Sequence, residues 1–285
     1  MTRFNITKEE LKELKEVGNG TDGRVFKYNN NYLVKIYRTQ LKNIIRSDNR
    51  FNKCIKIYDK DKLKLNNNSD YISYFINNGD EDIRIRNKDG LKLAAKRQKN
   101  IYRSSLPVDI VYVDDIFAGC LLKKINGTDI HKLTGMPTKY KRKIIKSLIL
   151  DIEELLYNYI YHIDIDNSPY SVSLFMDENG NIRIKKGHSN VLVNKITGKT
   201  NIIDLDGKST IYMERYNYNL EQKCLIGLTR LIIEFLFKID TDEIKEIDEL
   251  YFELLKKGLS DNIAYKLSSY RVEAIKELKK ELKLF

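Results

Sequence analysis

Three glycines near the start of the chain, Gly18, Gly20 and Gly23, have the spacing of a phosphate-binding loop. Glycine has no Cβ, so such a loop can lie flat over a triphosphate and offer it backbone amides. A dinucleotide-binding fold would open a helix after this motif, whereas here two strand-like runs follow, separated by an Asn-rich turn at residues 29–31. The pattern therefore predicts a glycine loop between strands, with Lys35 on the return strand as the side chain that reaches the phosphates.

A second polar set lies at the ends of a short hairpin, GHSNVLVNKITGKTNIIDLDG, at residues 187–207. Its two apolar runs predict two short strands joined by a turn. Asn190 stands directly before the first run, and Asp204 and Asp206 follow the second. Because a hairpin brings its ends together, we expect the amide and the carboxylates to face the same spot.

The elements that carry these residues in the first part of the chain are mainly strands. Thr7 and Glu10 have the spacing of a capping box, which predicts a short opening helix. A hairpin is predicted at residues 108–113 and 116–125, turning at Asp114-Asp115, after a helix within NKDGLKLAAKRQKNI. Residues 40–90 are polar and Asn-rich, and they predict an irregular insertion.

The second part of the chain is predicted to be helical. Apolar residues recur at helical spacing across residues 139–161, which indicates a long helix with one buried face. CLIGLTRLIIEFLF is apolar on nearly every side, so a helix beginning near Glu221 should be central, and amphipathic helices finish the chain, the last at residues 272–284. The expected division is a β-rich part at 1–125 and a helical part at 126–285.

Composition favours a soluble globular protein. With 285 residues and 42% apolar content, the chain can bury a sizeable core. No basic-then-apolar leader opens it, and no apolar run approaches the roughly 20 residues of a membrane span, so we expect a cytoplasmic protein without a membrane partner. Cys54, Cys120 and Cys224 are odd in number and far apart within apolar stretches, which favours core thiols over zinc or disulfides.

The net charge of +11 raises the question of nucleic acid as a partner. Basic clusters occur at residues 96–103 and 139–143, but acidic residues are interleaved almost everywhere. Nucleic acid is therefore not expected as the main partner. A basic surface would still steer phosphate-bearing or acidic molecules toward the protein.

The order of these motifs resembles the protein kinase-like superfamily, which includes protein kinases and the aminoglycoside and choline phosphotransferases. GNGTDGRV resembles its glycine loop, LVKI its lysine strand, GCLLKKING its last strand and hinge, and SNVLVNKITGKTNIIDLDG its metal-binding segment. The resemblance covers most of the chain outside residues 40–90. It implies an α+β, bilobal protein kinase-like fold, with a β-rich N-lobe and a helical C-lobe that bind ATP and Mg²⁺ between them.

The resemblance also gives each candidate residue a role. It implies that Asn190 and Asp204 coordinate the Mg²⁺ ions that bridge the ATP phosphates, with Asp206 close enough to substitute or assist. The residues that it implies for ATP binding are Gly18, Gly20, Gly23, Val25, Lys35 and Lys124.

One departure from the family concerns the catalytic base. The family's catalytic Asp lies five positions before the metal-binding Asn, where this chain has Lys185, and an ammonium cannot accept a proton from a substrate hydroxyl. SVSLF and NIRIK around a DENG turn indicate a hairpin inserted between His162-Ile163-Asp164 and Asn190. Asp164, which has the family's His-x-Asp form, is the first candidate. Asp166, which gains the correct spacing once 169–187 is removed, is the second, and loss of the base stays open.

A second departure concerns the partner of Lys35. The family pairs this Lys with a Glu on the helix before the fourth strand, but LKLAAKRQKNIYRSS contains no acid. Asp89 and the cluster at 80–82 lie just upstream and would serve if the helix began earlier. Otherwise the site would assemble only on binding a partner.

The combined prediction is an ATP- and Mg²⁺-dependent phosphotransferase, with a serine/threonine protein kinase acting on a protein substrate or bound to a regulatory partner as the first choice. The segment after Asp204 reaches the next helix in about fifteen residues and lacks an Ala-Pro-Glu stretch, which leaves room for a small-molecule kinase. Lys185 and the missing helix Glu are the grounds for a third possibility, a nucleotide-binding pseudokinase that acts as a scaffold or regulator.

Overall fold

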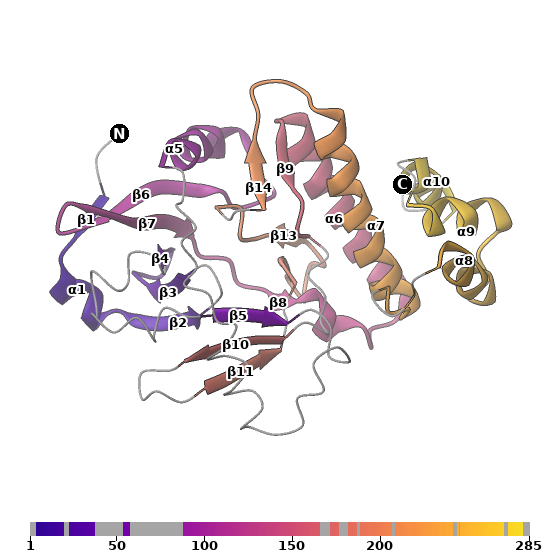
Figure 1. Ribbon diagram of the computed structural model, residues 1–285, viewed down its shortest axis with the longest axis horizontal. Coiled ribbons are helices and arrows are strands. Elements are labelled where there is room, and N and C mark those ends of the chain that lie inside the picture. The colour runs from indigo at the N-terminus through magenta and orange to yellow at the C-terminus, as the bar shows by residue number, and fades with distance from the viewer. Residues whose placement is uncertain are drawn as a thin grey trace.

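The computed structural model describes residues 4–19, 23–37, 54–57, 88–165, 172–176, 182–186, 189–206, 209–241, 244, 246–270 and 273–281. A six-stranded sheet in the order β1-β6-β7-β4-β3-β2 forms most of the N-terminal part, and helices dominate the C-terminal part (Figure 1). The expected α+β arrangement, with a β-rich part before a helical part, is confirmed. Within the described ranges, no helix is both long and apolar enough to cross a membrane.

The two hairpins that the sequence predicted, β3–β4 and β6–β7, form the middle of the sheet, and the edge strands β1 and β2 were not part of a predicted hairpin. The capping box at Thr7 and Glu10 is present at the start of α1, and Asp114 and Asp115 both have positive φ, at 45° and 68°, in the turn between β6 and β7. The helix before that hairpin is α5. The elements of this part are β1 (Phe4–Ile6), α1 (Lys8–Glu13), β2 (Lys15–Asn19), β3 (Gly23–Lys27), β4 (Tyr32–Tyr37), α5 (Lys88–Arg97), a 3₁₀ turn (Gln98–Asn100), β6 (Pro107–Val113) and β7 (Ile116–Lys123).

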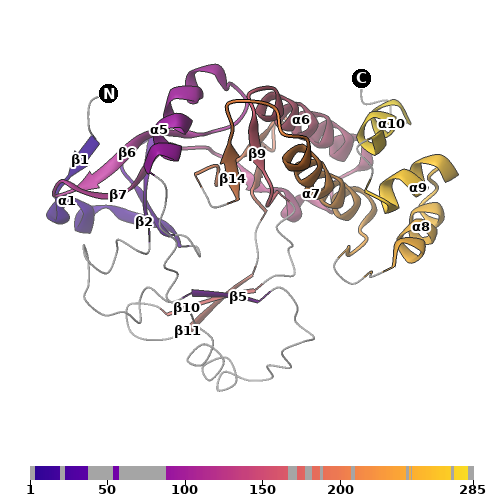
Figure 2. The same ribbon diagram turned by 45° about the horizontal axis from the view of Figure 1, so that its top comes forward.

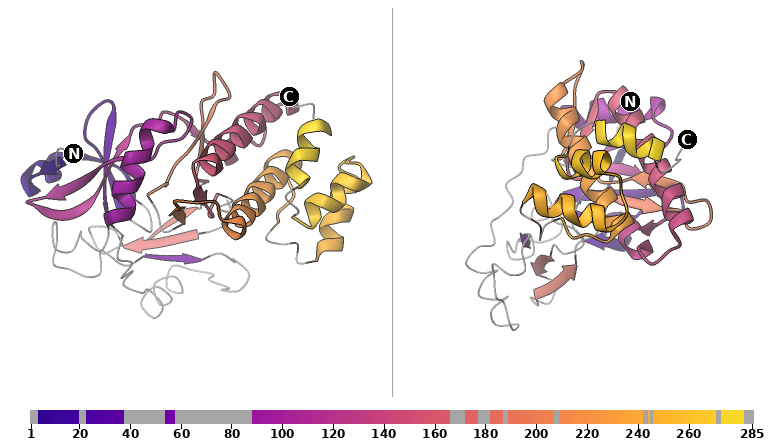
Figure 3. Two further views of the ribbon diagram at one scale, coloured as in Figure 1. Left: turned by 90° about the horizontal axis from the view of Figure 1, so that it is seen from above. Right: turned by 90° about the vertical axis from the view of Figure 1, so that its right-hand side faces the viewer.

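The helical part surrounds several short strand pairs. β12 pairs with β13 and β8, and β14 pairs with β9, all antiparallel. Helices α8, α9 and α10 lie beyond α6 and α7, at the end farthest from the sheet (Figure 3). The elements are β8 (Thr128–Asp129), a 3₁₀ turn (Ile130–Leu133), α6 (Thr138–Tyr157), β9 (Ile160–His162), β12 (Val191–Val193), β13 (Thr200–Ile202), β14 (Thr210–Tyr212), α7 (Tyr218–Phe237), α8 (Ile247–Lys256), α9 (Asp261–Ser268) and α10 (Glu273–Glu281).

The long helix ends earlier than its periodicity predicted. α6 stops at Tyr157, and Tyr159 takes a left-handed backbone with φ of 55°. A residue in that conformation cannot continue a right-handed helix. Residues 160–162 therefore form β9 instead of a last helical turn, and this change of direction carries the chain toward Asp164.

A further small sheet joins two segments that are far apart in the sequence. β10 (Val172–Met176) pairs antiparallel with β11 (Ile182–Lys186), which is the inserted hairpin that was predicted. β5 (Cys54–Ile57) adds to its other edge, with Val172 opposite Ile57 and Phe175 opposite Cys54 (Figure 2). The prediction that residues 40–90 are irregular is wrong for 54–57, because β10 supplies the backbone partners that a strand needs. α5 begins at Lys88, within the segment that was predicted to be helical.

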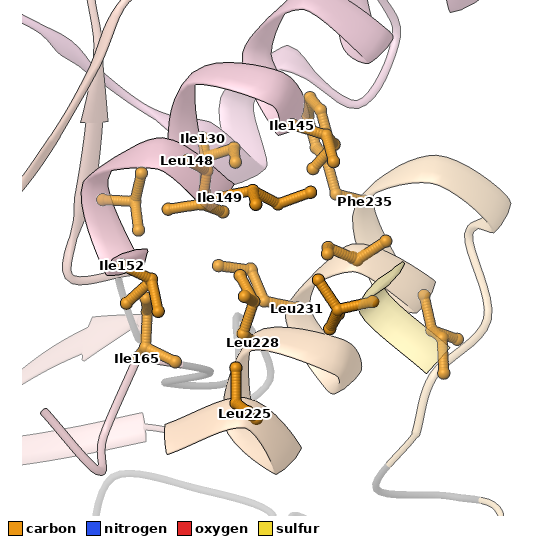
Figure 4. Packing of buried hydrophobic residues seen from close by; sticks show 14 of the residues in the cluster. Ile130, Ile145, Leu148, Ile149, Ile152, Ile165, Leu225, Leu228, Leu231 and Phe235 are labelled. Atoms are coloured by element: carbon orange, nitrogen blue, oxygen red, sulfur yellow. The ribbon is translucent and has the colours of Figure 1, made fainter. Parts of the chain in front are cut away.

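The described residues form three buried apolar clusters. The largest lies in the helical part, where the buried faces of α6 and α7 meet through side chains such as Leu148, Ile152, Leu228 and Leu231 (Figure 4). The other two lie in the β-rich part, and one of them includes Val34. α7 is buried along most of its length, so its predicted central place is confirmed.

A buried carboxylate ties the segment after α5 to α6. The Asp151 side chain is fully buried; it accepts from Arg103 Nε at 2.7 Å and from the Thr200 hydroxyl. Arg103 also donates to Ser147 Oγ at 3.0 Å, and its backbone N–H donates to Glu154 at 2.9 Å. Burial raises the pKa of Asp151 to about 7, although the Thr200 hydroxyl and the Arg103 guanidinium act in the opposite direction.

This raised pKa predicts a pH dependence of stability. Since the folded protein binds the Asp151 proton more tightly than the unfolded chain, stability is greatest below the unfolded pKa of 3.8 and falls as the pH rises to about 7. The difference between the folded and unfolded pKa, at about 1.4 kcal/mol for each pH unit, limits the loss of folding free energy to about 4 kcal/mol. In urea unfolding, the free energy of unfolding should fall less between pH 5 and pH 8 for Asp151→Asn than for the wild type. The exposed Asp248→Asn serves as a control, and equal losses in Asp151→Asn and wild type would contradict the prediction.

Candidate active site

Lys35 lies where the sheet meets the segment that follows β13. It is in β4, opposite Val25 of β3 on one side and Cys120 of β7 on the other. Its side chain is only 6% exposed, and its ammonium contacts the carboxylates of Asp204 and, at 3.1 Å, Asp206. Two acids placed about 170 positions away in the sequence therefore meet the lysine that the glycine-loop pattern singled out.

Asp206 is the more deeply buried of the two acids. Its side chain is 0% exposed, and Tyr37 donates to its Oδ2 at 3.0 Å. Cys120 lies beside this group, and burial, followed by the negative charge of Asp206, raises the pKa of its thiol well above the usual value. The thiol therefore stays neutral, as expected for the core cysteine that the sequence predicted.

Asp204 has a different environment. Its side chain is 32% exposed, and its backbone is left-handed with φ of 62°. The preceding residue, Ile203, donates its N–H to the Asn190 carbonyl at 2.8 Å, and the Thr210 hydroxyl donates to the Asp204 carbonyl at 3.4 Å. A non-glycine residue in this conformation is uncommon and is concentrated at functional sites.

Asn190 joins the two candidate segments. It is 2% exposed, and its side-chain Nδ2 donates to the Asp164 carbonyl at 2.7 Å. The amide nitrogen is thus the donor, which leaves Oδ1 as the atom able to bind a cation. The bond places Asp164 next to Asn190 although the β10–β11 hairpin separates them in sequence. Asp166, the other candidate base, lies outside the described residues, as does His188.

His162 is a structural neighbour of this group. It is 1% exposed, and its Nδ1 lies 2.9 Å from Thr210 Oγ1, so Thr210 bridges His162 and the Asp204 carbonyl. Burial lowers the pKa of His162 to about 4. The imidazole is therefore neutral at pH 7, and it holds the segment after Asp204 rather than carrying a charge.

The partners that the sequence indicated for Lys35 lie outside the described residues. Asp89 is in the first turn of α5, with its side chain outside the described set, and residues 80–82 are also outside it. The described partners of Lys35 are Asp204 and Asp206. Sequence reasoning missed Tyr37, which lies two positions after Lys35 in a strand, shares its face and reaches the Asp206 carboxylate.

Of the three glycines of the predicted loop, Gly18 lies in β2 and Gly23 in β3, and Gly20 is outside the described residues. Gly18 lies opposite Val25. A Cβ on Gly23 would lie 2.3 Å from the Ile36 carbonyl, so this glycine is required by the close approach of β4. Lys124 follows β7 and donates its backbone N–H to the Asn31 carbonyl. The described contacts of Lys35 do not include the Lys124 side chain.

The donor set suits a hard cation. In the part of the chain that the structure describes, no three His, Cys, Asp or Glu side chains are grouped as a metal site. The atoms near Lys35 that can bind a cation are carboxylate and amide oxygens, which Mg²⁺ prefers and combines with phosphate oxygens and water. Two carboxylates facing one ammonium also leave a net negative charge, so the residues present fit Mg²⁺ bound together with a phosphate ligand.

Comparison with known proteins gives limited help. No family model matches the chain, and no curated protein matches it. Among solved structures, the chain is similar to the kinase PK-1 of Cydia pomonella granulovirus, with 11% sequence identity, a TM-score of 0.49 and 97% of each chain covered. At these values the likeness carries no inference about activity, which has to come from the chain's own side chains.

Proposed function

We propose that the protein is an ATP- and Mg²⁺-dependent phosphotransferase that moves the γ-phosphoryl group of ATP to a hydroxyl. The observation that carries the proposal is the meeting of Lys35 with Asp204 and Asp206 beside the Asn190–Asp164 bond. A lysine, a metal-binding carboxylate and amide, and a further carboxylate are the parts that phosphoryl transfer requires.

Each residue then has a distinct task. Lys35 binds phosphate oxygens of the nucleotide, and Asn190 and Asp204 hold the metal. Mg²⁺, when bound, neutralises charge on the phosphates. Asp164 orients the acceptor hydroxyl and accepts its proton. Since this chemistry depends on positioning and charge, the rigid backbone around Asp204 and Asn190 is part of the machinery.

The acceptor is a protein hydroxyl in the first version of this proposal and a small molecule in the second. One observation favours the second version. The segment after Asp206 soon forms β14, whose Thr210 lies opposite His162 of β9, and α7 begins at Tyr218. Because this segment is short and is paired with β9, it leaves little room for a surface that binds an extended peptide. The bond between Asn190 and Asp164 supports an enzyme over a pseudokinase, because a scaffold does not need it.

Thermal unfolding with and without Mg-ATP tests the proposed function. Ligand at one hundred times its Kd stabilises a protein by about 2.7 kcal/mol, so the wild-type melting temperature should rise by about 5 °C or more. Asp204→Ala should lose most of this rise, and transfer of label from γ-labelled ATP should be lost with it. The exposed Asp248→Ala should behave like the wild type. A wild-type protein that Mg-ATP does not stabilise would rule out the proposed site.

A further inference from the structure

We propose that Asp206 is the residue that positions Lys35, and that Asp204 alone of the two acids serves the metal; this inference rests on the proposed function. Family resemblance treats the acids as neighbours able to replace one another. Both acids contact Lys35, but Asp206 also accepts a hydrogen bond from Tyr37, and the two acids differ in exposure and in backbone conformation. The two carboxylates therefore divide the work.

The first step is that Asp206 is bonded on both sides by groups from one strand. Lys35 and Tyr37 are two positions apart in β4, so both side chains leave the same face of the sheet. Their Nζ and Oη lie 3.1 Å and 3.0 Å from the Asp206 carboxylate. The Tyr37 ring is 1% exposed and packs against Phe117 with ring centroids 6.1 Å apart. The hydroxyl is thereby held at a fixed place for Asp206.

The second step is the cost of burial. A charged pair withdrawn from water is stable only when further hydrogen bonds satisfy it, and removal of one partner leaves an uncompensated charge. The Lys35 and Asp206 side chains are 6% and 0% exposed, and Tyr37 supplies the additional donor. Asp204, at 32% exposed, can exchange its contact with Lys35 for a metal ion at lower cost. Asp206 would have to give up two buried bonds.

The third step concerns the described contacts of α5. Its last residue, Arg97, donates to the Asn158 carbonyl at 2.9 Å and the Met213 carbonyl at 2.5 Å. The helix is thus fastened to the end of α6 and to the chain after β14. The described contacts that align Lys35 come from β4 and from the segment containing Asp206.

A double-mutant cycle on the nucleotide-free protein tests the pairing without reference to activity. Asp206→Asn should lower the melting temperature by about 6 °C or more, because it removes the fully buried carboxylate that Lys35 faces. In the Lys35→Met background the same change should cost much less. The matched cycle with Asp204→Asn should show a smaller coupling. Equal couplings, or a larger one for Asp204, would overturn the proposal.

Nucleotide and metal binding separate the two roles further. With a non-hydrolysable ATP analogue, Asp206→Asn should weaken binding about tenfold in EDTA as well as in Mg²⁺, corresponding to about 1.4 kcal/mol. Its Mn²⁺ affinity in the nucleotide complex, measured by electron paramagnetic resonance, should stay near that of the wild type. Asp204→Asn should weaken Mn²⁺ binding in the nucleotide complex and leave nucleotide binding in EDTA near that of the wild type. Loss of Mn²⁺ binding in Asp206→Asn, with metal-free nucleotide binding unchanged, would make Asp206 a metal ligand and end the proposal.

Tyr37→Phe is the milder variant if Asp206→Asn does not fold. It removes one donor and keeps the ring, so a several-fold loss of nucleotide affinity is expected, and affinity equal to the wild type would count against the role of Asp206. Should the wild-type protein bind no nucleotide, the proposed function fails, while the thermal cycle still decides whether Asp206 holds Lys35. The two failures are therefore distinguishable.

Discussion

Replacing Asp164 by Asn is expected to reduce phosphoryl transfer by a factor of about 10² to 10⁴ and to leave Mg-ATP binding unchanged. An amide keeps the size of the side chain but cannot accept the proton of the acceptor hydroxyl. The Asn190 amide bonds to the backbone carbonyl of Asp164, not to its carboxylate. The substitution should therefore leave the metal-binding side chains in place.

Single-turnover transfer from labelled ATP, together with the Mg-ATP thermal shift, measures the two effects separately. Asp166→Asn, the rival candidate, should reduce transfer far less. Lys185→Met is a further control, because the structure places Lys185 within β11, opposite Ser173 in the inserted hairpin. A severe loss in Asp166→Asn with activity retained in Asp164→Asn would transfer the role of base to Asp166.

Gly119→Ala is expected to damage both stability and the site. Gly119 lies opposite Ile36 in the pairing of β4 with β7, and a Cβ there would stand 1.8 Å from the Lys35 carbonyl. The strand that carries Lys35 would have to move. Overpacking of this kind costs about 2 to 4 kcal/mol, and the displaced lysine should also lower nucleotide affinity.

Urea unfolding and nucleotide titration check this prediction, and Gly135 offers a matched control. Gly135 is exposed, with nothing within 4 Å of an added Cβ, so Gly135→Ala should change stability by less than about 0.5 kcal/mol. If Gly119→Ala unfolds at the same urea concentration as Gly135→Ala, the close approach of β4 and β7 is not a constraint. Full nucleotide affinity in a destabilised Gly119→Ala would show that the strand shift does not reach Lys35.

Local signals explain which parts of the structure the sequence predicted. The turn at Asp114-Asp115, the capping box at Thr7 and the hairpin after Asn190 depend on residues within a few positions of one another. Lys35 could be placed because alternation along a strand is itself local. The inserted hairpin was predicted for the same reason, from two runs of strand-forming residues around a turn.

Contacts between distant positions explain what was missed. The bonds of Asp206 to Lys35 and Tyr37 join residues about 170 positions apart, and no local pattern records them. β5 was missed because its partner β10 lies more than a hundred residues later. The helical periodicity after residue 157 suggested more helix, but the left-handed Tyr159 ends it. In each case tertiary contacts outweigh the preference of the segment.

The ion pair between Lys35 and Asp204 has a thermodynamic consequence for ligand binding. The Lys35 ammonium and the Asp204 carboxylate contact each other. At the proposed site, a phosphate that engages Lys35 releases Asp204 for the metal, and a metal that engages Asp204 releases Lys35 for the phosphate. Each ligand therefore lowers the cost of binding the other, and linkage requires the effect to be reciprocal. The proposed site would therefore bind nucleotide and cation cooperatively, each more tightly in the presence of the other.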